Sequence, residues 1–549
     1  MSANPYADLP TTVEIPDRPV TALLDDAVAR FPERVALSFF GVTLTYRQLD
    51  RAVDRAVNVM RERGHRPGDP VAILTPNSPH AVILYQAVLR AGGIVVMLNP
   101  LLVERELLTI LTDCRAKIAF VSNLFLAKID AIQPQTPLAS IVVLALDDYM
   151  PWLTGRLFNV KMRLEGRKPL NRRDATHTPW KSAMAAVPDV ALRPPLTSAD
   201  TALYLYTSGT TGAAKAVELT HANVLANAYQ CGAWFVDATP GEEVFLLALP
   251  LFHAFGMTVG MNTALRLGAT MVLTPKFDAG QVMKLVAKHR VTMLPGVPAM
   301  YHAINHHPDA ARRDLSSVRY CISGAATLPK ETKETFEKLT GGTLVEGYGL
   351  SEASPCTHCN PLRAPNKEGS IGLPLPNTAY AIVAGPEGEE VPAGEIGELI
   401  VKGPQVMKGY HGRPADSDLA LKNGWLFTGD MGYRDADGFV YLMDRKKELV
   451  ITGGCNVYPR EVEEALYRID GVVEAAVVGM PDDYLGEQVV AAVVVRPDAG
   501  LTEASVIARL KEDLAGYKVP KRVRFLDTLP KTVIGKVLKR QVKEEMMKG

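Results

Sequence analysis

One stretch decides how this chain is best understood: Tyr206-Thr207-Ser208-Gly209-Thr210-Thr211-Gly212-Ala213-Ala214-Lys215. It continues an apolar run that starts at Thr201, alternates small hydroxyl residues with glycines, and ends at a lysine. Glycine lets the backbone turn tightly and approach a ligand. Hydroxyls, exposed N–H groups and the lysine supply donors and positive charge for a polyphosphate. The stretch therefore predicts a phosphate-binding loop, with an ordinary Ser/Thr/Gly surface loop as the alternative.

This loop differs from the common nucleoside-triphosphate loop. That motif places a lysine and then a serine or threonine directly after its second glycine. Here Gly212 is followed by two alanines, Lys215 and Ala216. The common loop is therefore excluded, and the identity of the phosphate site depends on the rest of the chain.

Four further motifs follow the loop in order. They are Gly347-Tyr348-Gly349-Leu350-Ser351-Glu352, Gly424-Trp425-Leu426-Phe427-Thr428-Gly429-Asp430, Asp444-Arg445-Lys446-Lys447 and Pro530-Lys531-Thr532-Val533-Ile534-Gly535-Lys536. Together with the loop they resemble the adenylate-forming superfamily of acyl-CoA synthetases, peptide-synthetase adenylation domains and beetle luciferases. The resemblance extends from about Thr45 to Arg540 and is most like a bacterial medium- or long-chain fatty acyl-CoA ligase. It is specific for the superfamily and much less specific for the substrate.

The composition indicates an ordinary globular protein. The 549 residues are too many for one core, so we expect two or more domains. A hydrophobic content of 47% and a formal net charge of zero give no sign of nucleic-acid binding. Six scattered cysteines favour a reducing compartment over a disulfide framework. The acidic N-terminus does not resemble a signal peptide, so we expect a soluble, cytoplasmic protein.

The hydrophobic pattern predicts an α/β fold. Apolar strand-like runs alternate with helical patterns through about the first 440 residues, which favours layers of helices around largely parallel, buried strands. The most apolar stretch, residues 81–102, is expected to form a buried helix and then a buried strand, because polar residues and a Gly-Gly pair interrupt it. From Gly394 onward, short strands with glycine turns predict a small β-subdomain.

The charged link at Arg445-Lys446-Lys447-Glu448 predicts a domain boundary, although a solvated surface turn is the alternative. We expect a large N-terminal domain of layered α/β subdomains plus the β-subdomain over residues 1–444. Residues 445–549 are expected to form a small, mobile α+β domain. In the superfamily this point is the hinge, and the resemblance puts its pivot at Lys447.

The resemblance assigns residues to ATP and Mg²⁺. The loop from Thr207 to Gly212 and Lys215 would hold the β- and γ-phosphates. Ala214 and Ala216 replace the proline and glycine that usually flank the family's lysine, so a direct role for Lys215 is left open. Glu352 and Thr207 would bind Mg²⁺, which prefers a carboxylate together with substrate oxygens. The resemblance also implies that the following residues contact the nucleotide: Ser208, Gly209, Thr210, Thr211, Gly324, Ala325, Glu346, Gly347, Tyr348, Ser351, Asp430, Arg445 and Lys447.

Several of these residues have individual roles in the superfamily. Tyr348 would stack on adenine, where a flat ring offers contact area, and Ser351 would touch the α-phosphate. Asp430 would accept hydrogen bonds from both ribose hydroxyls, supported by Arg445. Lys536 would bridge the acyl carboxylate and the α-phosphate as the catalytic lysine. By composition alone, Lys536 is one solvated lysine among many.

The acyl and CoA sites are also implied by the resemblance. His253 lies in an apolar segment where a lone histidine is usually a core residue, but the family places an aromatic or histidine here beside the acyl group. The predicted acyl pocket comprises His253, Phe255, Gly256, Met257, Ser323 and Gly324. Some long-chain relatives carry a gating tryptophan where this chain has Met257, so that gate is not expected. Gly453 and Gly454 would line the CoA tunnel once the small domain rotates.

One segment does not fit the α/β pattern. Residues 152–181 interleave apolar residues with eight Arg and Lys residues, which is typical of elements that lie on anionic membranes. Long-chain fatty acyl-CoA synthetases look similar in carrying extra sequence here. We therefore consider a peripheral membrane contact through this segment, with a solvated flap as the alternative.

The five motifs and the resemblance that they carry indicate one reaction. A carboxylic acid does not acylate a thiol at useful rates because hydroxide leaves poorly, and adenylation replaces hydroxide with AMP. We expect an ATP- and Mg²⁺-dependent acyl-CoA ligase that converts a medium- or long-chain fatty acid through acyl-AMP to acyl-CoA. An aryl-acid CoA ligase or a carrier-protein-loading enzyme is the first alternative. A non-catalytic nucleotide-binding paralogue is the second, and pyrophosphate release would separate it from an enzyme.

Overall fold

The computed structural model describes residues 5–165, 169–170, 172–207, 214–385, 388–453, 455–482, 484–532 and 537–548. The chain divides into two compact units. The first unit comprises Met1–Glu368, Gly372–Ala379 and Lys402–Gly424. The second comprises Gly369–Ile371, Tyr380–Val401 and Trp425–Gly549. Each unit therefore contains segments that are distant in sequence.

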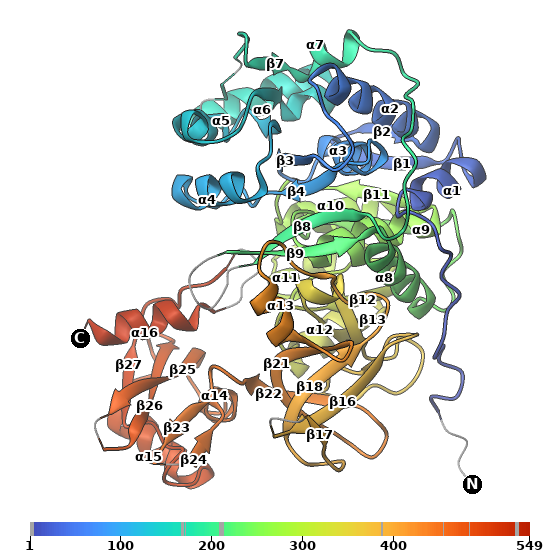
Figure 1. Ribbon diagram of the computed structural model, residues 1–549. Helices are drawn as coiled ribbons and strands as arrows, with labels where there is room; N and C mark the ends of the chain where they lie inside the picture. Colours follow the sequence, from blue (N-terminus) through green and yellow to red (C-terminus); the bar gives the residue numbers. More distant parts are fainter. Residues whose placement is uncertain are drawn as a thin grey trace. The chain divides into compact units, whose positions relative to one another are not determined.

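The largest sheet of the first unit has eight strands (Figure 1). Their order is β19 (Gly409–Tyr410), β9 (Lys215–Thr220), β8 (Thr201–Thr207), β4 (Ile94–Met97), β3 (Pro70–Leu74), β5 (Ile118–Ser122), β6 (Ser140–Leu144) and β7 (His177–Pro179). The strands from β8 to β7 are parallel, with Val71 opposite Val95 and Ile118. Only β9 and β19 add to it in antiparallel fashion.

Helices flank this sheet and the rest of the N-terminal region. They are α1 (Ala22–Arg30), α2 (Tyr46–Glu62), α3 (Pro79–Arg90), α4 (Glu104–Cys114), α5 (Leu126–Ile132), α6 (Trp152–Leu164) and α7 (Trp180–Ala185). Every residue of α3 is buried, and β4 follows it as a fully buried strand. The predicted buried helix and buried strand are therefore confirmed for this most apolar stretch. No described helix is long and apolar enough to cross a membrane.

Two smaller sheets complete the first unit. One has the order β10 (Val244–Leu247), β11 (Thr270–Leu273), β1 (Val35–Phe39) and β2 (Val42–Thr45). The other has the order β12 (Tyr320–Ser323), β13 (Thr343–Gly349), β14 (Cys356–Cys359) and β15 (Leu373–Pro374). Between these two sheets, Met293 in a short apolar run forms isolated parallel bridges to Phe245 and Tyr320. The accompanying elements are α8 (His221–Trp234), α9 (Thr263–Leu267), α10 (Ala279–His289), α11 (Pro298–Asn305), α12 (Lys330–Thr340), α13 (Pro414–Ala420) and β20 (Leu421–Lys422).

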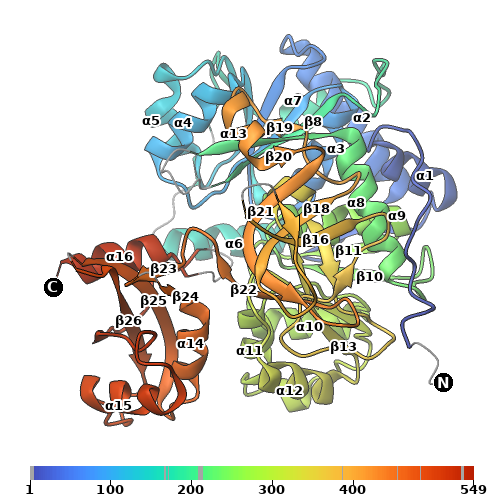
Figure 2. The same cartoon turned by 60° about the horizontal axis from the view of Figure 1, so that its bottom comes forward.

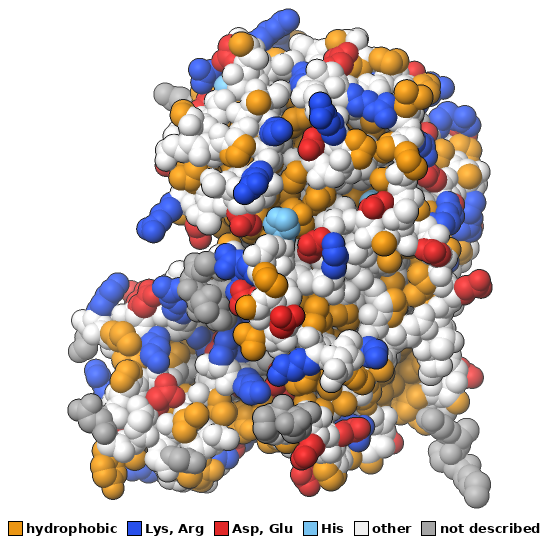
Figure 3. Space-filling model, viewed as in Figure 1, with side chains coloured by type: hydrophobic (Ala, Val, Ile, Leu, Met, Phe, Trp, Pro, Cys, Tyr) orange, Lys and Arg blue, Asp and Glu red, His pale blue; other side chains and the backbone are white. Residues whose placement is uncertain are grey.

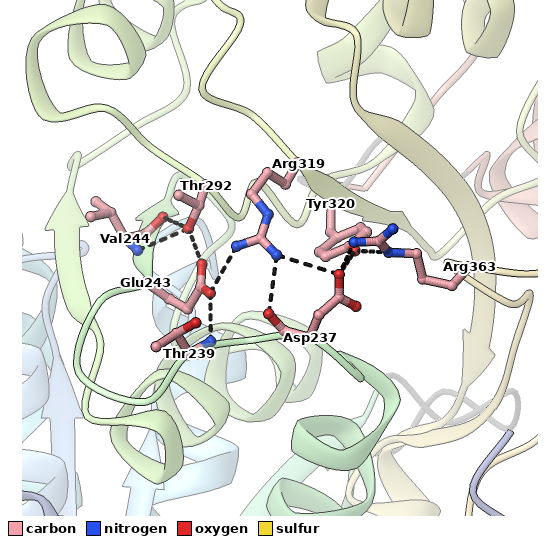
Figure 4. Close-up of polar contacts among 8 residues, drawn as sticks. All are labelled: Asp237, Thr239, Glu243, Val244, Thr292, Arg319, Tyr320 and Arg363. Atoms are coloured by element: carbon pink, nitrogen blue, oxygen red, sulfur yellow. Dashed lines mark hydrogen bonds and ion pairs between the residues drawn. The ribbon is translucent and has the colours of Figure 1, made fainter. Parts of the chain in front are cut away.

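A polar network fixes the start of β12 (Figure 4). The buried Glu243 carboxylate accepts hydrogen bonds from Arg319 at 3.1 Å and from the Thr292 hydroxyl at 2.6 Å. Asp237 accepts from the Tyr320 hydroxyl at 2.8 Å and pairs with Arg363. Because Tyr320 begins the strand that ends at Ser323, the network holds the strand that carries one of the predicted ligand loops.

The second unit contains two sheets. The first has the order β17 (Glu389–Glu390), β16 (Ala379–Ala384), β18 (Gly397–Lys402) and β21 (Trp425–Arg434), with β22 (Val440–Arg445) also paired to β21. The second has the order β24 (Cys455–Val457), β23 (Val450–Thr452), β26 (Gly486–Val495) and β25 (Val472–Asp482), with β27 (Arg522–Phe525) parallel to β26. The first of these sheets is the predicted β-subdomain.

Alternating residues of β25 and β26 make two cores. One face packs on α14 (Pro459–Tyr467) and α15 (Glu503–Asp513), with Val477 and Ala491 among its buried residues. The other face packs on α16 (Lys539–Met547), with Val478 and Ala492 buried. This period of two is what a sheet covered on both faces requires. Together with the N-terminal sheets, it confirms the predicted fold class.

Figure 3 shows basic and acidic side chains interspersed on the face it draws, in keeping with a formal net charge of zero.

Candidate active site

The predicted phosphate loop connects two paired strands. Thr207 ends β8 and Lys215 begins β9, and the two residues are directly opposite in the antiparallel register. Residues 208–213 between them, which include Ser208, Gly209, Thr210, Thr211 and Gly212, lie outside the described residues. The Lys215 ammonium lies 2.8 Å from the Asp416 carboxylate and 5.2 Å from the centre of the Tyr410 ring. The hairpin thus presents the lysine at the base of the loop.

Glu352 lies in a short 3-10 turn, Ser351–Ala353, directly after β13. The Tyr410 hydroxyl donates a hydrogen bond of 2.9 Å to Glu352 Oε1, while no described residue donates to Oε2. The Glu352 carbonyl accepts the Met407 N–H at 2.8 Å, which holds the turn. A half-buried carboxylate with one oxygen available is the oxygen-donor chemistry that Mg²⁺ prefers. Glu352 and the Thr207 hydroxyl therefore fit a divalent cation chemically.

The predicted adenine residues lie along β13 and the turn after it. Tyr348 is half-buried, and its ring lies 6.4 Å from the ring of buried His358. Burial lowers the pKa of His358 to about 3, so this imidazole is neutral. A side chain on Gly349 would place its Cβ 2.1 Å from the Pro355 carbonyl oxygen, so only glycine fits. The Glu346 carboxylate, in the same strand, accepts the Leu328 N–H at 2.9 Å.

The loop after β12 lies beside the predicted acyl segment. A Cβ on Gly324 would lie 3.0 Å from the Phe255 ring, so these two predicted residues are in close proximity. Ser323 is fully buried, and its hydroxyl makes no hydrogen bond to any described residue. Ala325 has a φ of 69°, which a non-glycine residue rarely adopts. Such strain is often retained at ligand-binding loops.

The acyl segment contains a π-helix, Gly256–Asn262, that the sequence did not predict. Such helices are rare and frequently occur at functional sites. A side chain on Gly256 would place its Cβ 2.4 Å from the Pro250 carbonyl oxygen, and Met257 is buried within the helix. His253 is half-buried, and its Nδ1 accepts the Phe255 N–H at 3.3 Å. This bond orients the imidazole with Nδ1 as an acceptor.

The two predicted ribose residues pair in the second unit. Asp430 is opposite Arg445 in the register of β21 and β22, and their side chains meet at 3.2 Å. Asp430 is buried. The preceding turn is held by Glu398, whose carboxylate accepts the Gly429 N–H at 3.0 Å. The structure therefore brings together an acid and a base that are 15 residues apart in the chain.

The predicted hinge and CoA residues follow in the same unit. Lys447 is exposed, and Gly453 has a φ of 56° at the turn between β23 and β24. Gly454 and the predicted catalytic Lys536 lie outside the described residues. An isolated bridge between Lys531 and Val537 brackets the segment that carries Lys536.

Comparisons with known proteins decide the family. Residues 24–411 match the AMP-binding enzyme family, and residues 461–536 match the AMP-binding enzyme C-terminal domain. The chain belongs to the AMP-binding enzyme family. A long-chain-fatty-acid–CoA ligase of Bacillus subtilis is 43% identical over 540 residues, which cover 98% of this chain and 96% of that protein.

Two further relatives help to place this AMP-binding enzyme. A feruloyl-CoA synthase of Amycolatopsis is 38% identical over 93% of this chain and 96% of the relative. The crystal structure of ATP-bound MatB from Rhodopseudomonas palustris superimposes with a TM-score of 0.85 at 32% identity, over 96% of this chain and 99% of that one. These comparisons confirm the predicted superfamily, the two-part α/β fold and the reaction class of an AMP-forming acid–thiol ligase that uses ATP, Mg²⁺ and CoA.

Sequence reasoning missed several residues of this AMP-binding enzyme. Tyr410 and Asp416 contact the predicted metal and phosphate residues, yet neither belongs to a predicted motif. Lys539 was not predicted either. Its ammonium lies 3.1 Å from Glu463 and 3.7 Å from Asp444, which directly precedes the predicted hinge. The sequence around Tyr410 and Asp416 does not indicate these contacts, because their partners Glu352 and Lys215 are distant in the chain.

Proposed function

We propose that this AMP-binding enzyme is an ATP-dependent fatty acyl-CoA ligase that acts on medium- or long-chain fatty acids. The observation that carries the proposal is the near-full-length similarity to a long-chain-fatty-acid–CoA ligase, at 43% identity. An apolar segment at the predicted acyl site, with Phe255 beside Gly324 and a buried Met257, suits an alkyl chain. Each methylene that such a site buries is worth about 0.8 kcal/mol.

The reaction begins when the acid's carboxylate attacks the α-phosphorus of ATP and expels pyrophosphate. Lys215 and the Thr207 loop neutralise the outgoing phosphates, and Asp430 with Arg445 holds the ribose. Glu352 and Thr207 would hold Mg²⁺, which would supply charge neutralisation for the triphosphate. Lys536 stabilises the charge that develops between the carboxylate and the α-phosphate. The CoA thiolate then attacks the acyl carbonyl and AMP leaves.

The second half-reaction uses a different arrangement of the chain. We propose a large domain over residues 1–444 and a small mobile domain over residues 445–549, which rotates about Lys447. The two family matches support this division, because they end and resume on either side of it, at residues 411 and 461. After rotation, Gly453 and Gly454 line the pantetheine tunnel. A bulky residue at Gly454 should therefore leave acyl-AMP formation intact and stop thioester formation.

A substrate panel tests the proposal. The purified protein is given ATP, Mg²⁺ and CoA with acids from acetate to palmitate, benzoate and ferulate, and kcat/KM is measured for each. We expect kcat/KM to rise with chain length, because the methylene contribution is about fourfold per group. Highest kcat/KM for ferulate would favour the aryl alternative, for which the 38% identical feruloyl-CoA synthase gives some support. Acyl-AMP that reacts with a carrier protein and not with CoA would favour the carrier-loading alternative.

We also propose a peripheral membrane contact through residues 152–181, and α6 is the part that supports it best (Figure 1). Leu153, Leu157, Val160 and Leu164 recur at helical spacing, and each is more than half exposed. Gly155 and Met162 face the protein instead and are buried. An exposed apolar stripe on one helix is unusual for a surface that contacts only water.

The basic residues around this apolar stripe favour anionic lipids. Arg156, Lys161 and Arg163 flank it, and the Arg156 guanidinium also lies 4.2 Å from the centre of the exposed Trp152 ring. A basic helix with a tryptophan and an apolar stripe binds at the interface of anionic bilayers. Fatty acids partition into bilayers, so such a contact would bring the enzyme to its substrate.

Vesicle flotation tests this contact. The protein is mixed with vesicles of phosphatidylcholine alone or of phosphatidylcholine with phosphatidylglycerol. Replacing Arg156, Lys161 and Arg163 by Gln should weaken binding to the anionic vesicles by about a hundredfold, since each basic group is worth about 1 kcal/mol near such a surface. Leu157→Ser should weaken binding, while Leu192→Ser, which removes another exposed leucine, should not. Equal binding of the unchanged protein to neutral and anionic vesicles would refute the proposal.

A further inference from the structure

The segment 407–416 contacts two residues of the predicted phosphate site, although no sequence motif links them. We propose that Tyr410 is a positioning residue that fixes the metal-binding carboxylate of Glu352 and the ammonium of Lys215 in one arrangement, with Asp416 as the second support of the lysine. The inference rests on the proposed function, because it assumes that Glu352 binds Mg²⁺. It adds a residue to the machinery without altering the reaction.

The backbone holds this segment, which contains β19 and the start of α13 (Figure 2), at two independent points. Strand β19 pairs with β9, so that Tyr410 is opposite Val217, and the His411 N–H donates to the Ala216 carbonyl at 2.9 Å. The Met407 N–H donates to the Glu352 carbonyl at 2.8 Å. The segment is therefore bonded both to the strand that begins at Lys215 and to the turn that carries Glu352. Its position is therefore fixed by backbone hydrogen bonds within the protein.

The Tyr410 hydroxyl determines the orientation of the Glu352 carboxylate. Its hydrogen bond of 2.9 Å ends on Oε1, which leaves Oε2 as the oxygen that a cation can approach. The phenol is the donor in this bond, because a carboxylate oxygen accepts. Mg²⁺ demands near-ideal octahedral geometry, so a carboxylate that rotates freely is a poorer ligand. Partners of this kind typically contribute 10- to 100-fold to metal affinity.

The Tyr410 ring and Asp416 act on Lys215. The ammonium lies 5.2 Å from the ring centre, a favourable distance for a cation on an aromatic face, and 2.8 Å from Asp416 Oδ1. Both side chains of the ion pair are mostly buried. A long lysine side chain loses rotamer entropy when it is ordered. The contacts with Asp416 and Tyr410 restrict the Lys215 side chain, so less of this cost remains for the binding step.

Two variants separate the contact with Glu352 from the contact with Lys215. Tyr410→Phe keeps the ring face over Lys215 and removes only the donor to Glu352. Asp416→Asn keeps the shape and removes the charge that faces Lys215. Tyr441→Phe is the matched control, because it removes another tyrosine–carboxylate hydrogen bond, to Asp435, in the second unit. Thermal unfolding of each variant shows whether it is folded.

Metal binding is measured directly as well as through activity. Mn²⁺ is titrated into each protein with the ATP analogue α,β-methylene-ATP and followed by electron paramagnetic resonance, and the Mg²⁺ dependence of pyrophosphate release is measured in parallel. We expect Tyr410→Phe to weaken Mn²⁺ binding and to raise the Mg²⁺ concentration for half-maximal rate, each by about 10- to 100-fold. Asp416→Asn should raise the KM for ATP and leave the metal dependence unchanged.

Glu352→Gln distinguishes failure of this inference from failure of the proposed function. If Glu352→Gln leaves Mn²⁺ binding unchanged, Glu352 is not the metal ligand and the proposed role is wrong. If Glu352→Gln abolishes Mn²⁺ binding but folded Tyr410→Phe binds Mn²⁺ like the unchanged protein, the proposed function stands and the positioning role of Tyr410 is refuted. In the expected outcome, the double variant is no worse than Glu352→Gln alone.

Discussion

Replacing Asp430 by Asn should remove much of the enzyme's selectivity for the ribose of ATP. Asp430 is buried, pairs with Arg445 at 3.2 Å and has the predicted role of accepting both ribose hydroxyls. Asn has almost the same shape, but it carries no charge and offers one acceptor oxygen in place of two. The substitution therefore tests the carboxylate with little change in packing.

The magnitude follows from the kind of hydrogen bond that is lost. A hydrogen bond to a charged group contributes about 1.5–3 kcal/mol, which is roughly 10- to 150-fold in affinity. The unchanged enzyme should prefer ATP to 2′-deoxy-ATP by a factor in this range. Asp430→Asn should raise the KM for ATP by a similar factor and affect 2′-deoxy-ATP much less, because the bond to the 2′-hydroxyl is already absent.

The assay is pyrophosphate release with both nucleotides at subsaturating concentrations. Glu390→Gln is the control, because it removes one acid of an ion pair with Arg434 in the same sheet, at 2.7 Å, and should not change the preference. The ratio of kcat/KM between the two nucleotides is the quantity compared. An unchanged ratio in folded Asp430→Asn would refute the role of this carboxylate in ribose binding.

Three other predictions concern the acyl segment, pH and the half-reactions. Gly256→Ala should lower the free energy of unfolding by about 1–3 kcal/mol, because its Cβ would lie 2.4 Å from the Pro250 carbonyl oxygen. Gly516→Ala is the control, because a Cβ there would lie in open space. Equal melting temperatures of the two variants would contradict the predicted clash. Burial lowers the pKa of His221 to about 4. Between about pH 6.5 and 4 the imidazole is therefore protonated in the unfolded chain and neutral in the folded protein. The free energy of unfolding should then fall between pH 6.5 and 4, by at most about 3 kcal/mol, and denaturant titrations of His221→Gln should show a shallower fall. Lys536→Ala should slow acyl-AMP formation by roughly 10²–10³ but still convert supplied acyl-AMP and CoA to thioester, and equal loss in both steps would argue against separate arrangements.

The hydrophobic pattern was sufficient to predict the main layers of the fold. Helix α3 and strand β4 are buried on all sides, so their sequences are continuously apolar and could be recognised without a partner. The C-terminal strands alternate between two cores, which also leaves a local signal. Met293 illustrates the limit, since a short apolar run there forms only an isolated bridge. Short runs do not reveal how many neighbours they will pair with.

Candidate site residues could be predicted from the sequence where they belong to a local motif. Asp430 and Arg445 were identified separately from their motifs, and the register of β21 and β22 then places them opposite each other. Tyr410 was not identifiable, because it meets Glu352 across 58 residues of sequence and its local context is an ordinary strand end. The π-helix at Gly256 was also unpredictable, since its hydrogen-bond pattern depends on the backbone that packs around it.

The transfer of oxygen from the fatty acid to AMP tests the central claim most directly. Palmitate labelled with ¹⁸O in both carboxylate oxygens is incubated with the enzyme, ATP, Mg²⁺ and CoA, and the products are analysed by mass spectrometry. The carboxylate that attacks the α-phosphorus leaves one of its oxygens on AMP when the thiolate displaces it. The account therefore predicts one ¹⁸O per AMP, one in palmitoyl-CoA and none in pyrophosphate. Palmitoyl-CoA formed together with unlabelled AMP, or with ADP and labelled phosphate, would contradict it.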